Sequence, residues 1–135
     1  MNDHERHDQG MRVRRGVLGD AHVDRAVANT TDLTAPFQEF ITRYAWGDVW
    51  AREGLDRRTR SIVTLAALTS LRAENEIAMH VRAAITNGLT PAEITEVLLH
   101  TAVYAGLPAA NAAFAIAQRT LAEMGVPEAA AGGEA

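Results

Sequence analysis

Hydrophobic residues recur every three or four positions along most of this chain, which is the period of helices that are buried on one side. Strand-like alternation of apolar and polar residues is not sustained in any segment. The pattern therefore predicts an all-α fold of about six helices. From the apolar stripes and the residues that flank them, we expect helices over about 20–28, 34–46, 57–70, 74–87, 91–104 and 109–124.

The clearest helix boundary is the segment Thr90-Pro91-Ala92-Glu93. Threonine at the N-cap, proline at the first helical position and glutamate at the third form a capping box. Thr34 and Asp56 are expected to cap the helices that follow them. Gly88 stands where helices commonly end in a left-handed residue. Gly47 is expected to end the helix that starts at Thr34.

Two of the predicted helices should be buried in different ways. The helix over 34–46 carries one apolar stripe, which we expect to face the core: Phe37, Phe40, Ile41 and Tyr44. The helix over 57–70 is apolar on nearly all sides, so it is expected to be central. Trp46 and Trp50 lie in the irregular stretch between the two, where tryptophans pack in a core or an interface more often than they contact ligands.

The length of the chain, 135 residues, fits one domain. Residues 1–10 are polar, and we expect them to form a flexible N-terminal tail. The helical domain is predicted to cover residues 11–125. Residues 126–135 are rich in alanine and glycine, and they are expected to form a flexible C-terminal tail.

Composition excludes several classes of function. The chain has no cysteine, which excludes disulfides, thiol catalysis and thiolate metal sites. A net charge of −4 gives no support for nucleic-acid binding. No apolar signal-peptide core follows Met1, and no apolar run approaches the roughly 20 residues that span a bilayer. We therefore expect a soluble cytoplasmic protein that does not bind a membrane.

Two glutamate–histidine pairs share the same spacing, Glu76 with His80 and Glu96 with His100. Residues four apart lie one turn above each other on a helix, so each carboxylate can orient an imidazole. Histidine transfers protons near neutral pH, so the pairs indicate a proton-transfer pocket. Surface salt bridges remain the alternative interpretation. Metal binding is disfavoured, because neither a zincin HExxH nor a di-iron Glu-x-x-His motif is present.

Three arginines, Arg57, Arg58 and Arg60, stand at the start of the predicted central helix. The helix dipole disfavours cations at this end. A bound anion would relieve the conflict, because it can accept hydrogen bonds from guanidinium groups and backbone N–H groups. The alternative is a solvated charged turn whose partners are residues such as Glu53 and Asp56.

The chain resembles the carboxymuconolactone decarboxylase family of the alkylhydroperoxidase D-like superfamily. The resemblance runs from about residue 12 to 124, and the combination of motifs is specific although each one alone is weak. It rests on residues 17–25, 44–50, 54–61, 76–80, 87–88 and 93–108.

This resemblance implies an all-helical subunit that assembles into a homo-oligomer, a trimer or a hexamer. It also implies that 4-carboxymuconolactone loses CO2 to give 3-oxoadipate enol-lactone, a step of protocatechuate degradation in the β-ketoadipate pathway. No metal or organic cofactor is expected. Related alternatives are a decarboxylase or isomerase of a similar lactone, and an oligomeric binding protein without catalysis.

Redox members of the superfamily carry a C-x-x-C-x-x-x-H motif. When its histidine is aligned with His80, the cysteine positions fall on Ala73 and Glu76. Neither residue is a thiol, so peroxidase and disulfide-reductase activity are excluded on chemical grounds.

The implied reaction assigns roles to the candidate residues. His80, supported by Glu76, is the expected acid or hydrogen-bond donor to the dienolate. His100, steadied by Glu96, is the second candidate.

The implied substrate is a dianion, so Arg57, Arg58 and Arg60 are expected to bind it. Trp46 is expected to supply part of an apolar wall beside the leaving carboxylate. His22 lies in a matching motif and is a further candidate, in the same subunit or from a neighbouring one.

Overall fold

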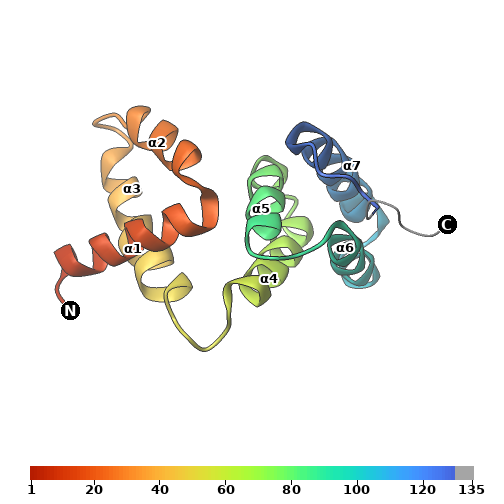
Figure 1. The fold of residues 1–135 in the computed structure, drawn as a ribbon, viewed down its shortest axis with the longest axis horizontal. Coiled ribbons are helices and arrows are strands. Elements are labelled where there is room, and N and C mark those ends of the chain that lie inside the picture. Colours follow the sequence, from red (N-terminus) through yellow and green to blue (C-terminus); the bar gives the residue numbers. More distant parts are fainter. Residues whose placement is uncertain (130–135) are drawn as a thin grey trace. The chain divides into compact units, whose positions relative to one another are not determined.

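The computed structural model describes residues 1–129 and contains no strand within them, which confirms the all-α prediction (Figure 1). Residues 130–135, part of the predicted C-terminal tail, lie outside the described residues. In chain order the helices are α1 (Asp3–Leu18), α2 (Asp20–Ala28), α3 (Ala35–Ile41), the π-helix η1 (Thr42–Trp50), α4 (Arg57–Ser70), α5 (Glu74–Thr86), α6 (Pro91–Ala105) and α7 (Leu107–Met124).

The chain divides into two compact units, one of residues 1–57 and one that begins at Arg58. The first contains α1, α2, α3 and η1, and the second contains nearly all of α4 together with α5, α6 and α7. A single domain over residues 11–125 therefore stays a prediction. None of the helices in residues 1–129 is long and apolar enough to cross a bilayer.

The N-terminal segment is helical, so the prediction of a flexible tail over residues 1–10 is wrong. The side chain of Asn2 caps α1 by accepting a hydrogen bond from the backbone N–H of Glu5, at 2.8 Å. Asp3 and Glu5 in the first turn complement the helix dipole. Gly10 is buried, so the polar composition of the segment hid one packed face.

The first unit is held by a close approach of α1 to η1 that only glycine allows. A Cβ atom on Gly10 would meet the backbone oxygen of Thr42 at 1.9 Å. A Cβ atom on Gly47 would meet the backbone oxygen of Arg6 at 2.6 Å. Gly47 does not end a helix as expected, because η1 continues through it to Trp50. Its missing side chain serves contact between helices instead.

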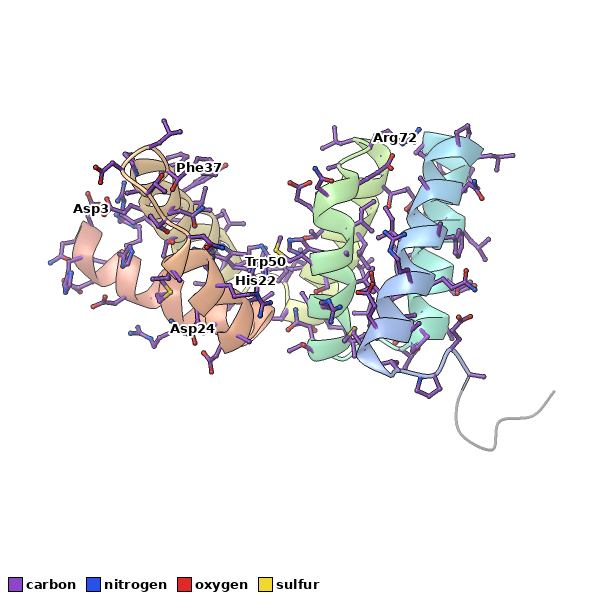
Figure 2. The ribbon with its side chains drawn as sticks, turned by 90° about the horizontal axis from the view of Figure 1, so that it is seen from above. Asp3, His22, Asp24, Phe37, Trp50 and Arg72 are labelled. Atoms are coloured by element: carbon purple, nitrogen blue, oxygen red, sulfur yellow. The ribbon has the colours of Figure 1, made fainter. Side chains whose placement is uncertain are left out.

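The apolar stripe of α3 and η1 is not buried in the described chain, contrary to the prediction. Phe37, Phe40 and Tyr44 are 61%, 50% and 53% exposed, while Ile41 is half-buried. Phe40 and Tyr44 stack with their ring centroids 5.1 Å apart. Figure 2 shows Phe37 on the outside of its unit. Helical periodicity identified the apolar face correctly but does not tell what covers it.

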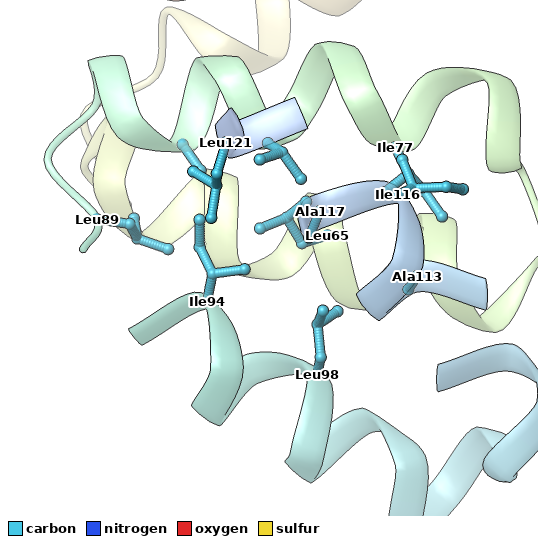
Figure 3. Close-up of a cluster of buried hydrophobic side chains, with 11 residues drawn as sticks. Leu65, Ile77, Leu89, Ile94, Leu98, Ala113, Ile116, Ala117 and Leu121 are labelled. Atoms are coloured by element: carbon cyan, nitrogen blue, oxygen red, sulfur yellow. The ribbon is translucent and has the colours of Figure 1, made fainter. Parts of the chain in front are cut away.

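The second unit is built around one apolar cluster supplied by all four of its helices (Figure 3). Its boundaries follow the sequence signals closely. Thr90 Oγ1 accepts from the N–H of Glu93 at 3.1 Å, and Glu93 Oε1 accepts from the N–H of Thr90 at 3.0 Å, which confirms the capping box. The members of the cluster are Leu65, Ile77, Val81, Ala84, Leu89, Ile94, Leu98, Ala113, Ile116, Ala117 and Leu121.

The helix α4 is less enclosed than its composition suggested. Leu65 is fully buried in the cluster, whereas Val63 is 55% exposed. The side of α4 that carries Val63 would be buried only if another layer of structure covered it. The described residues of this unit do not form such a layer.

Candidate active site

His80 is the buried member of the first glutamate–histidine pair. It lies on α5, where its side chain shares a face with Ile77 and Ala84, and only 7% of it is exposed. Glu76 lies one turn earlier and is exposed. A histidine held at the wall of a core has few rotamers and little water around it. Hydrogen bonds that it makes there act in a low dielectric and are correspondingly strong.

The second pair lies on the surface of the same unit. Glu96 and His100 on α6 are both exposed, and no ion pair joins them within residues 1–129. The ring of His100 packs instead against Tyr104, with centroids 5.4 Å apart and planes tilted by 41°. The two pairs are therefore not equivalent, although their spacing in the sequence is the same.

The arginine cluster already has protein partners. Arg58 forms an ion pair with Glu93, the residue that completes the capping box of α6. Arg60 is half-buried and Arg57 is exposed. The guanidinium group of Arg57 lies over Gly16 of α1, because a Cβ atom built on Gly16 would be 2.6 Å from Arg57 Nη1. Arg58 therefore fits the interpretation of the cluster as a charged turn. Its carboxylate partner is Glu93, whereas Glu53 and Asp56 were the expected partners.

A hydrogen bond that the sequence did not suggest fixes the helices that carry these groups. Asn87 Nδ2, at the end of α5, donates to Ser61 Oγ on α4 at 2.9 Å. Ser61 is completely buried. The bond sets the first turns of α4, which carry Arg58 and Arg60, against the last turn of α5. In the sequence, Ser61 ends the arginine-rich motif and Asn87 precedes Gly88. These positions next to motifs are the only feature of the sequence that draws attention to the two residues.

Two further candidates, Trp46 and His22, belong to the N-terminal unit. Trp46 in η1 is 6% exposed and packs against Trp50, with ring centroids 5.2 Å apart. Trp46 is therefore a core residue of the N-terminal unit. His22 lies on α2 and is half-buried (Figure 2). Burial lowers the pKa of His22 below its usual 6.5, and the positive charges of Arg14 and Arg25 lower it further.

Replacing Arg25 with glutamine is expected to raise the pKa of His22, because it removes one of the repelling charges. With a folded-state pKa below the unfolded value, the unfolded chain binds more protons between the two, so His22 makes the protein less stable as the pH falls through that window. Proton NMR titration of the His22 ring measures the pKa directly. A wild-type value at or above 6.5 would contradict this description of its surroundings.

Within residues 1–129, no group of three or more histidine, aspartate and glutamate side chains is arranged to hold a metal ion. A pocket of about 160 Å³ lies between α6 and α7, and none of the predicted site residues lines it.

Comparison with known proteins points to one family. The sequence model of the carboxymuconolactone decarboxylase family matches residues 35–119. The chain is 49% identical over 126 residues to 4-carboxymuconolactone decarboxylase of Acinetobacter baylyi, covering 93% of this chain and 94% of the relative. It is 46% identical over 117 residues to nitrosuccinic acid decarboxylase npaB of Metarhizium robertsii, covering 87% and 82%. A 4-carboxymuconolactone decarboxylase sequence of Pseudomonas putida is 56% identical over 48 residues, which is 36% of this chain and all of that sequence.

The segment that matches the family model contains every predicted site residue except His22. Both glutamate–histidine pairs, the three arginines and Trp46 lie inside it, whereas α1 and α2 lie outside.

Proposed function

Because the chain belongs to the carboxymuconolactone decarboxylase family, we propose that it is a carboxy-lyase that converts 4-carboxymuconolactone to 3-oxoadipate enol-lactone in protocatechuate degradation by the β-ketoadipate pathway. The observation that carries the proposal is 49% identity, over nearly the whole of both chains, to an enzyme of that name. The segment that matches the family model also contains the buried histidine His80, which supports the proposal.

The substrate supplies its own electron sink, so the reaction needs no cofactor. When the C–C bond to the leaving carboxylate breaks, the electron pair passes through the ring alkene onto the lactone carbonyl oxygen, and CO2 departs. The resulting dienolate takes one proton at a ring carbon to give the enol-lactone. The enzyme must stabilise the negative charge that develops on oxygen and deliver that proton.

His80 is the residue we assign to this proton. Its burial on the rigid helix α5 supports the role, because an acid held in one place loses little entropy in reaching its target. Glu76, exposed one turn away, is proposed to support the charge of the imidazole. His100 and Glu96 are kept as a second donor pair that lies on the surface of its unit.

Recognition of the substrate is assigned to the arginines and Trp46. Arg57 and Arg60 are proposed to bind the acetate arm, because tight pairing with the leaving carboxylate would oppose the loss of CO2. Arg58 already pairs with Glu93, so its role is to fix the start of α4. Trp46 is proposed to shield the leaving carboxylate from water. His22 is kept as a further candidate donor, in the same subunit or from a neighbouring one.

We also propose that the enzyme is a homo-oligomer, a trimer or a hexamer as in the family. Large apolar side chains stand exposed on several helices and loops of the described chain, and such residues usually mark contact surfaces when they gather. The most exposed are Leu33 at 89%, Tyr104 at 80%, and Leu71, Val103 and Leu107 at 76% each.

Nitrosuccinic acid is a second candidate substrate, favoured by the 46% identity to the fungal decarboxylase. Loss of CO2 from the carbon that bears a nitro group leaves an electron pair that the nitro group accepts as a nitronate. A second carboxylate remains for arginine to bind. The same arrangement of a guanidinium anchor and a proton donor would serve both reactions.

Turnover of the two substrates separates these functions. The purified protein is mixed with each compound, and CO2 release is followed against the spontaneous rate without protein. We expect the lactone to be the better substrate by kcat/KM. A higher value for nitrosuccinic acid would replace the proposal by the second candidate. Saturable binding of the lactone without turnover would favour a binding protein.

A further inference from the structure

Arg14 is a buried arginine whose hydrogen-bond partners are all neutral. It lies on α1, and only 6% of it is exposed. Nη2 donates to Gln38 Oε1 at 3.0 Å, and Nη1 donates to Thr42 Oγ1 at 3.4 Å. Nε is buried without a partner, and no carboxylate lies within 4.0 Å of the guanidinium group anywhere in residues 1–129. A buried charge without a counter-ion is costly, and native proteins seldom keep one without a purpose.

The absence of a counter-ion also shows in the acid–base properties of the group. Burial lowers the pKa of Arg14, and the neighbouring charge of Arg15 lowers it further. No acidic group of the unit raises it. An anion beside Arg14 would therefore interact with a positive charge that no carboxylate of the unit neutralises.

Such an anion has space beside it. Arg14 lines a pocket of about 310 Å³ that lies entirely within the N-terminal unit, between α1, α2, α3 and η1. That volume is at the lower end of the range for small-molecule sites. Polar and apolar side chains share its wall: His7, Thr30, Gln38, Glu39 and Thr42, with Met11, Val27 and Ala35.

From this geometry we propose that the pocket binds a small organic monocarboxylate, with its carboxylate on the guanidinium group of Arg14 and its apolar body against Met11, Val27 and Ala35. The guanidinium fork matches the planar geometry of a carboxylate. The apolar wall favours an organic body over an inorganic ion. Glu39 in the same wall disfavours ligands with two or more negative charges.

This site is additional to the one proposed for catalysis. None of the residues that line the pocket is among those assigned to the lactone, and Arg14 lies before the segment that matches the family model. The ligand class also differs, because the lactone substrate is a dianion. A site for a monocarboxylate in addition to the proposed catalytic site would let a small acid change the stability or the activity of the protein.

Benzoate is a suitable probe, because it combines one carboxylate with a small apolar body. Equilibrium dialysis with radiolabelled benzoate is expected to show saturable binding of one molecule per chain. Arg14→Gln is expected to weaken that binding at least tenfold. Arg12→Gln, exposed on the same helix, is the matched control and should bind as the wild type does. His80→Gln should also bind normally, which separates this pocket from the proposed catalytic site.

Three results would overturn the proposal: no saturable binding by the wild type, equal binding by Arg14→Gln, or displacement of benzoate by inorganic phosphate as effectively as by unlabelled benzoate. Because Arg14→Gln removes a buried group and can fail to fold, Val27→Phe provides an independent test. Val27 is 51% exposed at the pocket wall, so a larger side chain there fills the pocket without disturbing the core. It too should weaken benzoate binding, and unchanged binding would count against the pocket as the site.

Discussion

Replacing His80 with glutamine is expected to lower kcat for decarboxylation of 4-carboxymuconolactone about 10²- to 10⁴-fold, which is the usual contribution of a positioned proton donor. Glutamine keeps a hydrogen-bond donor of similar size but cannot deliver a proton to carbon. KM should change much less than kcat, because the donor acts after the substrate is bound. Steady-state kinetics at several pH values measure both constants.

His100→Gln is the matched control for this experiment. His100 has the same spacing to a glutamate, but it is exposed and packs against Tyr104. Its replacement is expected to leave kcat within a few-fold of the wild type. A His80→Gln protein that is folded and turns over at nearly the normal rate would remove His80 as the acid. A large loss in His100→Gln alone would transfer the role to the second pair.

Replacing Gly10 with alanine is expected to destabilise the N-terminal unit by about 3 kcal/mol or more, the upper range for overpacking. The added Cβ would lie 1.9 Å from the backbone oxygen of Thr42 and 3.0 Å from the backbone nitrogen of Gly47. Backbone atoms cannot turn aside as a flexible side chain can, so α1 and η1 would have to separate. Urea unfolding followed by circular dichroism, at one fixed protein concentration, measures the loss.

Gly54→Ala is the control for this prediction. Gly54 lies in the loop before α4, and a Cβ atom there meets nothing within 4 Å. The change in free energy of unfolding should stay within about 0.5 kcal/mol. Equal stability of the Gly10 and Gly54 variants would show that α1 and η1 do not pack as described.

The second unit was predicted well because its signals are local. A capping box, a proline at the first helical position and a glycine after a helix act within four residues, so Thr90 and Gly88 define boundaries without knowledge of the rest of the fold. The residues of the cluster around Leu65, Ile77 and Leu98 also recur at helical spacing within each helix, which is a local pattern.

The first unit was predicted poorly because its structure depends on contacts between distant segments. Gly10 and Gly47 look like helix breakers in sequence, yet each allows a backbone to approach another helix. The stripe at Phe37 and Phe40 has the periodicity of a buried face but lies exposed. Sequence spacing records which residues share a face and carries no information about the surface that will cover it.

The candidate site shows the same division. Motif spacing identified two equivalent histidines, whereas the fold buries His80 and leaves His100 at the surface. The pairing of Arg58 with Glu93 and of Asn87 with Ser61 joins residues more than twenty positions apart, which no local pattern indicates.

The most direct test of the proposed function is the stoichiometry and rate of the reaction itself. Purified wild-type protein is added to 4-carboxymuconolactone, and released CO2 and enol-lactone are measured together. We expect one CO2 for each enol-lactone formed, at a rate that is proportional to the protein concentration and far above the spontaneous rate. Loss of the lactone at no more than the spontaneous rate, with protein shown to be folded, would contradict it.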